Sequence, residues 1–253
     1  AFHEKLLEEY GDEWGNKLMF HYRWGYPADQ KRRSRTLATR MIGGLTLPFI
    51  GKLLGPVMAP VVVRRMVPRM AFAGANDNNA PLLVESFRNL VDMLQTHLAC
   101  RSYLFGECPA FGDFGLWGQL YQAYIDPSCE AILTERGPAV VAWIERMLAP
   151  EKHGEFESLA ALEPTLAPIF AREVGPRFLA WDVANARSWE AGETRTELTM
   201  DGRRYYQKTF KYPAHTLGIL LGKYDRARSD EGLAAFLSAT GCLDYLQQHS
   251  AQT

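Results

Sequence analysis

The sequence predicts an all-α protein, a helical bundle with one short β-hairpin near residues 196–209. Apolar residues recur every three or four positions through most of the chain, which is typical of amphipathic helices. The clearest run is Leu83, Phe87, Leu90, Leu94 and Leu98. One stretch alternates instead, TELTMDGRRYYQKTF, and its central Asp201-Gly202 pair favours a hairpin turn. With 253 residues, 47% of them hydrophobic, the chain can bury a core of its own.

The first helix is expected over Phe2 to Trp24, because the apolar and aromatic residues of this segment share one face. That face carries Leu7, Tyr10, Trp14, Leu18 and His21. Gly11 and Gly15 lower the local helix propensity by roughly 1 kcal/mol each relative to alanine. The helix therefore needs other elements packed against it.

A basic run from Lys31 to Arg40 leads into the apolar stretch Met41 to Val63, and Arg64, Arg65 and Arg69 follow. We expect the basic run to be a solvated loop, or else a contact for phosphate or lipid headgroups. Three prolines and Lys52 interrupt the apolar stretch, which argues against a transmembrane helix. An irregular buried or lid-like segment is the favoured interpretation. A surface segment attracted to anionic lipid stays open, since basic residues flank apolar ones.

The remaining elements follow from periodicity and from glycine and proline signals. After a loop at 74–81, the expected helices are 83–98, 109–124, 128–134, one from Pro138, 158–174, 177–191, 214–224 and 230–239. The pair 158–174 and 177–191 is divided by Gly175 and Pro176. Gly241 is expected to end the last helix in a left-handed conformation.

Composition restricts the function classes. The formal net charge of −1 predicts no general attraction to nucleic acid. The four cysteines form no CxxC pair and no histidine completes a metal site, so we expect no metal. Scattered thiols in a chain of this size indicate a cytoplasmic location. Ala1 lies inside a helical pattern without a secretion signal, which suggests part of a longer protein.

Asp113 stands at the start of an apolar and aromatic run, FGDFGLWGQLY. An acid in the first turn of a helix accepts hydrogen bonds from backbone N–H groups that have no partner in the helix. A role as a general acid or metal ligand would need a second group at useful spacing, and the sequence has none nearby. We therefore assign Asp113 as a structural helix cap and assign no catalytic residue.

The stretch YLFGECPAFGDFGLWGQL resembles the core motif of the all-helical C-terminal domain of glutathione transferases. The matching residues are Tyr103, Leu104, Gly106, Pro109 and Asp113. The later GPAVVAWIERM resembles a second motif of that domain through Pro138, Trp143, Arg146 and Met147. Ala110 departs from the family, which prefers a hydroxyl there. DEWGNKLMFHYRW and DGRRYYQKTFKY resemble a bacterial branch with a C-terminal extension.

The resemblance implies one helical domain over 1–253, with a core at 1–150, the motif clearest at 83–148 and a helical extension at 156–248. Family members carry a thioredoxin-like domain ahead of this one, which binds glutathione and activates its thiol. No βαβ pattern for that domain is present in this sequence. The resemblance therefore suggests either the C-terminal portion of a longer protein or a relative that has lost its first half.

The resemblance also implies a function, the conjugation of glutathione thiolate to a hydrophobic electrophile. This chain would bind the electrophile, a small hydrophobic molecule, and contribute to a homodimer. Alone it would be inactive, and glutathione would be a co-substrate only with the N-terminal domain present. The expected substrate-binding residues are Tyr10, Trp14, His21, Tyr22, Arg23, Trp24, Trp117 and Tyr121, although Trp14 and Trp117 also suit a core. The alternative is a non-catalytic binding or assembly module, associated or not with a membrane surface.

Overall fold

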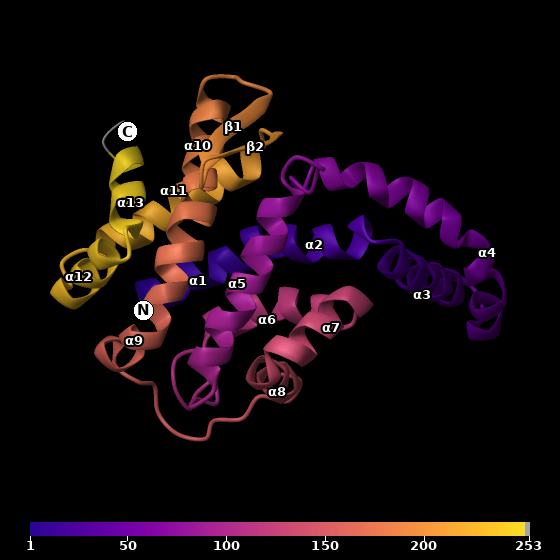
Figure 1. The fold of residues 1–253 in the computed structure, drawn as a ribbon, viewed down its shortest axis with the longest axis horizontal. Helices are drawn as coiled ribbons and strands as arrows, with labels where there is room; N and C mark the ends of the chain where they lie inside the picture. Colours follow the sequence, from indigo (N-terminus) through magenta and orange to yellow (C-terminus); the bar gives the residue numbers. More distant parts are fainter. Residues whose placement is uncertain (251–253) are drawn as a thin grey trace.

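The computed structural model describes residues 1–250 and confirms the predicted fold class. Helices dominate this part of the chain, and its single sheet is a two-stranded antiparallel hairpin (Figure 1). The large buried side chains form one continuous core, which includes Trp14, Trp143 and Trp181.

The first helix crosses the body of the molecule as α1 (Phe2–Tyr10), a π-helical turn (Gly11–Gly15) and α2 (Asn16–Gly25). The predicted low helix propensity around Gly11 has a structural reason. Helix α6 crosses the first helix at Gly11, and the two backbones lie very close together. A Cβ on Gly11 would lie 2.7 Å from the backbone nitrogen of Leu116. Glycine is thus required at this crossing, and tertiary packing compensates for its low helix propensity.

The segment after α2 corrects two predictions. The basic run lies on a helix, α3 (Pro27–Leu45), and the apolar stretch lies in α3 and a second helix, α4 (Pro48–Met66). The predictions of a loop at residues 31–40 and of an irregular segment at residues 41–63 were wrong. The prolines in the second segment do not break α4. Pro48 occupies its first turn, where no N–H is needed, and Pro56 and Pro60 are exposed on the surface. A short 3₁₀ turn, Val67–Ala71, leads back to the body.

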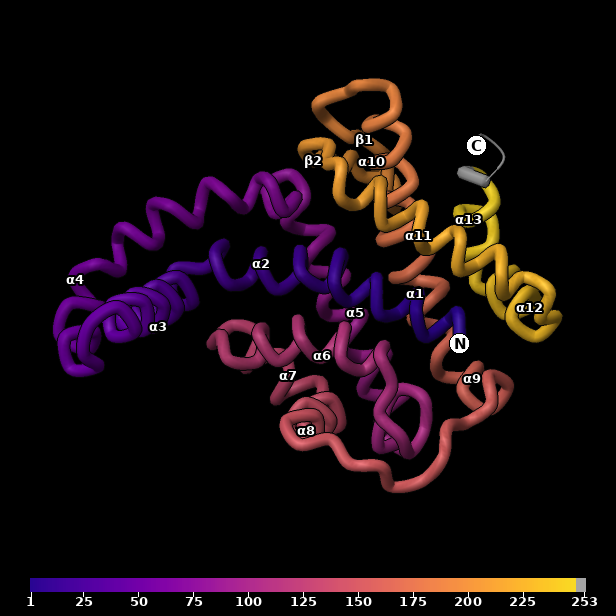
Figure 2. Tube along the Cα trace, turned by 180° about the vertical axis from the view of Figure 1, so that it is seen from behind, coloured from indigo at the N-terminus to yellow at the C-terminus, as the bar shows by residue number. Residues whose placement is uncertain are grey.

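The central bundle is α5 (Ala80–Leu98), α6 (Phe111–Tyr124), α7 (Pro127–Arg136) and α8 (Pro138–Arg146). Each begins close to its predicted start, and proline occupies an early position in three of the four. These helices pack against one another and against α1 and α2 (Figure 2).

The C-terminal part contains one long helix where two were predicted. It runs as α9 (Leu159–Ile169), a π-helical segment (Phe170–Leu179) and α10 (Ala180–Glu190). The predicted break at Gly175 and Pro176 was wrong, since the wider π-helical turns carry both residues without ending the helix.

The predicted hairpin is confirmed as β1 (Arg195–Met200) and β2 (Arg203–Lys208), with Arg195 opposite Lys208. Its two turn residues both have positive φ, 47° at Asp201 and 72° at Gly202, as the tightest hairpin turns require. Three helices complete the fold, α11 (Lys211–Ala227), α12 (Glu231–Ala239) and α13 (Cys242–Ser250), the last of which was not predicted. Gly241 has the expected left-handed conformation, with φ of 70°.

Candidate functional site

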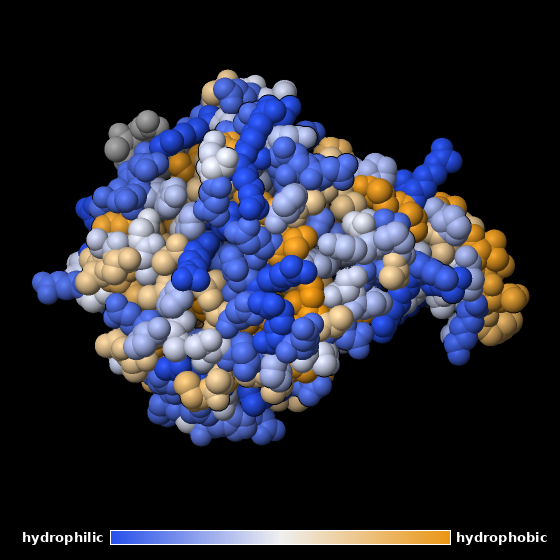
Figure 3. Space-filling view, in the orientation of Figure 1, coloured by the Kyte–Doolittle hydropathy of each residue, from blue (hydrophilic) through white to orange (hydrophobic). Residues whose placement is uncertain are grey.

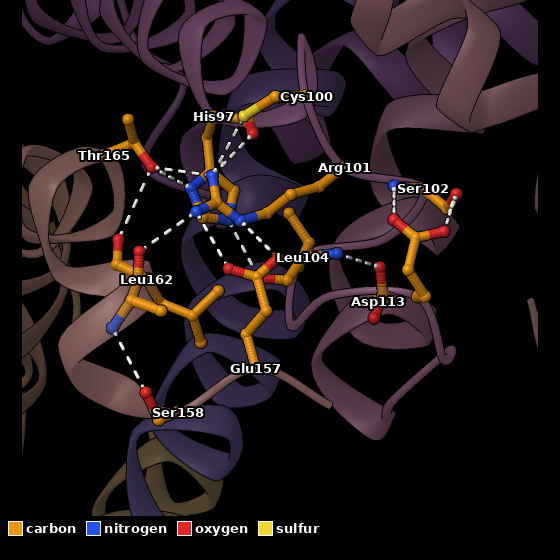
Figure 4. Close-up of polar contacts among 12 residues, drawn as sticks. His97, Cys100, Arg101, Ser102, Leu104, Asp113, Glu157, Ser158, Leu162 and Thr165 are labelled. Atoms are coloured by element: carbon orange, nitrogen blue, oxygen red, sulfur yellow. Dashed lines mark hydrogen bonds and ion pairs between the residues drawn. The ribbon is translucent and has the colours of Figure 1, made fainter. Parts of the chain in front are cut away.

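Asp113 is buried in the first turn of α6, and Figure 4 shows its contact with Leu104. One carboxylate oxygen accepts hydrogen bonds from the Leu104 backbone N–H, 2.8 Å away, and from Trp143 Nε1–H, 2.9 Å away. The other accepts from the Ala110 backbone N–H at 3.0 Å. Burial raises the pKa of Asp113 to about 6, although all three donors favour the charged form. These three hydrogen bonds use both oxygens of the carboxylate, so Asp113 has a structural role.

A second buried polar cluster lies beside the first and connects α5 to α9 (Figure 4). His97 contacts Thr165 Oγ1 through one ring nitrogen and the Leu104 carbonyl through the other, both at 2.8 Å. Arg101 donates two hydrogen bonds to the Glu157 carboxylate, each 3.0 Å long. The motif region is therefore a rigid scaffold with its polar groups satisfied.

The structure places most of the predicted substrate-binding residues in the interior. Trp14 Nε1–H donates to Ser86 Oγ at 2.9 Å, and the Ser86 hydroxyl donates to Glu173. The Tyr10 hydroxyl lies 3.5 Å from the same Glu173 carboxyl. Burial raises the pKa of Glu173 to about 8, so this carboxyl retains its proton at neutral pH.

The next four predicted residues lie further along α2 and are also buried. Arg23 donates to the Asp126 carboxylate at 2.6 Å and also to the Gln122 carbonyl. Tyr22 stacks on Tyr26, with ring centroids 5.4 Å apart. Trp24 and His21 complete the group, and His21 lines a cleft of about 410 Å³.

Trp117 and Tyr121 are half-buried on α6, on another side of the body. Their rings stack with centroids 5.2 Å apart, and Trp117 Nε1–H donates to the Ile144 carbonyl at 3.0 Å. Within residues 1–250 the eight predicted side chains therefore do not surround one cavity. His21 packs as well, with its ring centroid 5.5 Å from that of Tyr22 and 5.8 Å from that of Tyr26, and it also lines the cleft named above.

A different residue of the first helix, Lys17, lies in a cleft of about 480 Å³ that we call the Lys17 cleft. Five elements and two loops meet there: the π-helical turn Gly11–Gly15, α2, α10, β2 and α11, with the loops at 72–73 and 210. The lining residues are Asp12, Glu13, Asn16, Lys17, Phe72, Ala73, Trp181, Gln207, Phe210, Tyr212 and Pro213. The volume is within the range of small-molecule sites, and the mixture of aromatic rings with a few charged groups is typical of them.

Lys17 is buried, and its ammonium group contacts two residues from distant parts of the chain. Its Nζ lies 3.5 Å from the centroid of the Trp181 ring and 3.0 Å from Gln207 Oε1. Gln207 is itself fixed, because its amide nitrogen donates to the Phe72 carbonyl at 2.8 Å. The cleft thus holds a lysine in a fixed position beside an aromatic wall.

The electrostatics of the Lys17 cleft make this lysine titratable near neutral pH. Burial lowers the pKa of Lys17 to about 7, against the opposing effect of the Glu13 and Asp182 carboxyl groups. Burial also raises the pKa of Asp182 well above its usual range, and Asp182 Oδ1 has no hydrogen-bond partner. As an ammonium, Lys17 can bind an anionic group, and as an amine it can accept a proton.

Lys17 is not among the residues that the sequence predicts to bind a ligand. The available signal was its place in the first helix, where it lies three positions after Trp14 on a mostly buried segment. Its ring and amide partners, Trp181 and Gln207, are more than 160 residues away in the chain and could not be identified from local pattern.

Elsewhere, no group of three or more histidine, cysteine or acidic side chains within the described part of the chain could hold a metal ion. The buried thiols do not favour nucleophilic chemistry. Burial raises the pKa of Cys242 to about 12 and that of Cys129 well above the ordinary range.

Comparison with known proteins identifies one region. Residues 65–146 match the family model of the glutathione S-transferase C-terminal domain. The match covers α5 to α8 and includes Asp113, Trp143 and most of their surroundings. No curated protein and no solved structure shows a significant match to the chain. The chain thus carries a glutathione S-transferase C-terminal domain over 65–146.

Proposed function

We propose that this chain is the ligand-selecting, C-terminal portion of a glutathione transferase-like protein. The parent reaction would join the sulfur of glutathione to an electrophilic carbon of a hydrophobic molecule, with loss of the thiol proton. The family match over 65–146 supports the class of protein. The observation that carries the proposal for this chain is the Lys17 cleft, which combines aromatic walls with one buried lysine.

The division of labour follows from the chemistry of the described residues. Under this proposal the thiolate is formed and held by groups outside them, in the thioredoxin-like domain that the resemblance implies. The described residues contain no parallel sheet on which such a domain is built. This chain would supply the wall against which the electrophile rests, and a dimer surface.

The Lys17 cleft suits an aromatic electrophile that also carries an anionic or strongly electron-rich group. Phe72 and Phe210 offer ring surface, and the ammonium of Lys17, which is only 4% exposed, offers a charge held against the buried Trp181 ring. An electrostatic contact is stronger there than at an exposed surface because less water screens it.

Ligand binding can be tested with 1-anilinonaphthalene-8-sulfonate, an aromatic anion whose fluorescence rises on binding. Replacing Lys17 with methionine keeps the packing of the stem and removes the charge. A charge-assisted contact contributes about 1.5–3 kcal/mol, so affinity should fall about tenfold or more. Affinity of the original protein should also fall as the pH rises through about 7, where Lys17 loses its proton.

The matched control is Lys152→Met, which removes an exposed lysine whose partner is Glu155 at the surface. Unchanged affinity in Lys17→Met would exclude the cleft as the site. Conjugation is assayed separately, with the chain alone and with a thioredoxin-like domain joined ahead of Ala1. We expect turnover only from the joined protein, and turnover by the chain alone would refute the division of labour.

A binding or assembly module without catalysis is the second candidate. The observation that favours it is the projecting pair of helices α3 and α4, whose outer surface is apolar and lies away from the Lys17 cleft. Under this function, ligand binding in the cleft would persist but conjugation would not follow when the thioredoxin-like domain is added.

A further inference from the structure

Helices α3 and α4 form an antiparallel pair over residues 27–66, which we call the α3–α4 hairpin. It projects from one side of the body in both ribbon views (Figures 1 and 2). α4 packs chiefly on α3 and on the short turn that follows it, whereas α3 also reaches α2 and α7. Most of α4 therefore has one neighbour and a large surface without one.

The α3–α4 hairpin is held together by small residues. Gly51, Gly55 and Ala59 recur every four positions and are the buried residues of α4. A Cβ on Gly51 would lie 2.3 Å from the Thr39 carbonyl oxygen, and one on Gly55 would lie 2.1 Å from Thr39 Oγ1. Such close approach through small residues every four positions is the packing typical of helices in lipid.

The large apolar side chains of the α3–α4 hairpin point outward. In water, an amphipathic helix normally turns its leucines and phenylalanines to its partner and its small or polar residues to solvent. Here the order is reversed. Nine of the seventeen exposed large apolar residues in the described part of the chain belong to this segment, namely Met41, Leu45, Leu47, Phe49, Leu53, Leu54, Val57, Met58 and Val61. Figure 3 shows this hydrophobic surface towards the outer end of the projection.

Several polar groups of the connection between the two helices find partners within the connection itself. The backbone N–H of Thr46 donates to the Ile42 carbonyl at 2.9 Å, and the Thr46 hydroxyl donates to the same carbonyl at 2.6 Å. The N–H groups of Ile50 and Gly51 both donate to the Leu47 carbonyl. An element that enters an apolar medium needs this internal satisfaction.

The charge of the segment is as uneven as its hydropathy. Residues 31–69 contain nine lysines and arginines and no acidic residue, whereas the whole chain has a formal net charge of −1. The other residues therefore carry −10 in total. Among the nine cations, Arg32 alone has an ion-pair partner within the described residues, Glu130 at 3.5 Å. Lys31, Arg35 and Arg64 line a groove of about 450 Å³ between the two helices.

We propose that the α3–α4 hairpin docks on the surface of an anionic lipid bilayer, a role beyond the ligand-selecting function. The apolar outer face of α4, about 28 Å long, would lie at the boundary of headgroups and acyl chains. The cations would face the lipid phosphates. No helix among the described residues has the length and apolarity needed to cross a bilayer.

Charge argues against a second copy of the chain as the occupant. A twofold symmetric contact through this surface would place the same patch against itself and bring two sets of nine cations together. An anionic bilayer supplies both an apolar medium and the opposite charge. It accounts for the small-residue packing, the outward apolar residues and the lack of acidic residues together.

The test is co-sedimentation of the purified protein with two kinds of vesicle, pure phosphatidylcholine and phosphatidylcholine mixed with phosphatidylserine. We expect binding to the anionic vesicles that weakens with added salt, because exposed charges are screened. Each cation near an anionic surface contributes about 1 kcal/mol, or about fivefold in affinity. The triple variant Arg35→Gln, Arg64→Gln and Arg65→Gln should therefore bind about 100-fold more weakly.

A second variant tests the apolar face with exposed residues only, so that folding is preserved. Phe49, Leu53 and Val57 are 65%, 72% and 70% exposed, and all three become glutamine. The control set is Leu148→Gln, Phe156→Gln and Ile219→Gln, which are exposed elsewhere on the body. For the cations, the control set is Arg172→Gln, Arg226→Gln and Arg228→Gln.

Loss of vesicle binding in both hairpin variants, with both control sets unchanged, supports the proposal. Equal loss in the controls, or no binding of the original protein to anionic vesicles, overturns it. Sedimentation without lipid gives an independent result. If the Phe49, Leu53 and Val57 variant converts a dimer to a monomer and vesicle binding is absent, the surface is a self-interface and the lipid proposal fails.

Discussion

Replacing Asp113 with alanine tests the scaffold on which the family match rests. The side chain is fully buried and accepts hydrogen bonds from Leu104 N–H, Ala110 N–H and Trp143 Nε1–H. Alanine would leave all three donors without a partner.

The size of the effect follows from two opposing terms. Each buried donor left unpaired costs about 1–3 kcal/mol, which gives roughly 3–9 kcal/mol for three. Burying Asp113 as an anion costs about 3 kcal/mol at neutral pH, because its folded pKa is about 6 instead of 3.8. Replacing the residue with alanine removes this cost. The difference spans roughly 0–6 kcal/mol, and we expect a net loss of about 3 kcal/mol in the free energy of unfolding at neutral pH.

The sign of the pH dependence gives a sharper test. A carboxyl group with a raised folded pKa binds a proton more readily in the folded state. Its contribution to stability therefore falls as the pH rises from about 3.8 to about 6. Lowering the pH from about 7 to about 5 should stabilise the original protein through this group by about 1.4 kcal/mol. Asp113→Ala lacks this gain, so the difference between the two proteins should widen at the lower pH.

The assay is urea unfolding followed by tryptophan fluorescence and far-ultraviolet circular dichroism at both pH values. Asp113→Asn is the control, since it retains one acceptor oxygen and does not titrate. It should be less destabilised than the alanine variant, and its difference from the original protein should widen by the same amount at the lower pH, because it too lacks the titrating carboxyl group. An alanine variant within about 1 kcal/mol of the original protein at both pH values would refute the reasoning.

Three further predictions concern the buried charges and the hairpin. Because the pKa of Lys17 is lowered, its contribution to stability rises with pH. Between about pH 7 and about pH 9 the free energy of unfolding of the original protein should rise by about 2 kcal/mol, measured by urea unfolding. Lys17→Met should lack this rise. Glu173 has a pKa of about 8, so Glu173→Gln should cost less than about 1 kcal/mol at neutral pH. Because the raised pKa of Glu173 makes stability fall with rising pH, the glutamine variant should become relatively more stable from about pH 6 to about pH 8, and a constant difference would contradict the assignment. In Gly55→Leu the new Cβ would overlap Thr39. Amide hydrogen exchange should therefore accelerate in α3 and α4, while the unfolding midpoint of the body stays the same. Unchanged exchange would show that the two helices do not need the close approach.

Several elements could be predicted because their causes are local. The apolar period of α5, the turn residues Asp201 and Gly202, and the left-handed Gly241 depend on neighbours a few positions away. Asp113 belongs to this class, since a cap acts on N–H groups of its own helix turn. Its bond to Trp143, which lies 30 residues further along the chain, could not be derived from the same pattern.

Other features were predicted wrongly because local signals pointed elsewhere. α4 is apolar on nearly every side and contains internal prolines, so it shows neither helical amphipathicity nor an uninterrupted helix pattern. Gly175 and Pro176 are ordinary signals of a helix end, yet contacts such as that of Cys242 Sγ with the Phe170 carbonyl, at 3.7 Å, fix the chain there as a π-helical segment.

The amino-acid sequence by itself determined the fold class, most helix positions, the hairpin and the resemblance over the central motif, since these depend on periodicity and short spacings. Only the tertiary structure decided which side chains meet. It placed Tyr10, Trp14 and Arg23 in the core and brought Lys17 to Trp181 and Gln207. Burial and pKa depend on the groups that surround a side chain in space, and those groups come from helices far apart in the chain.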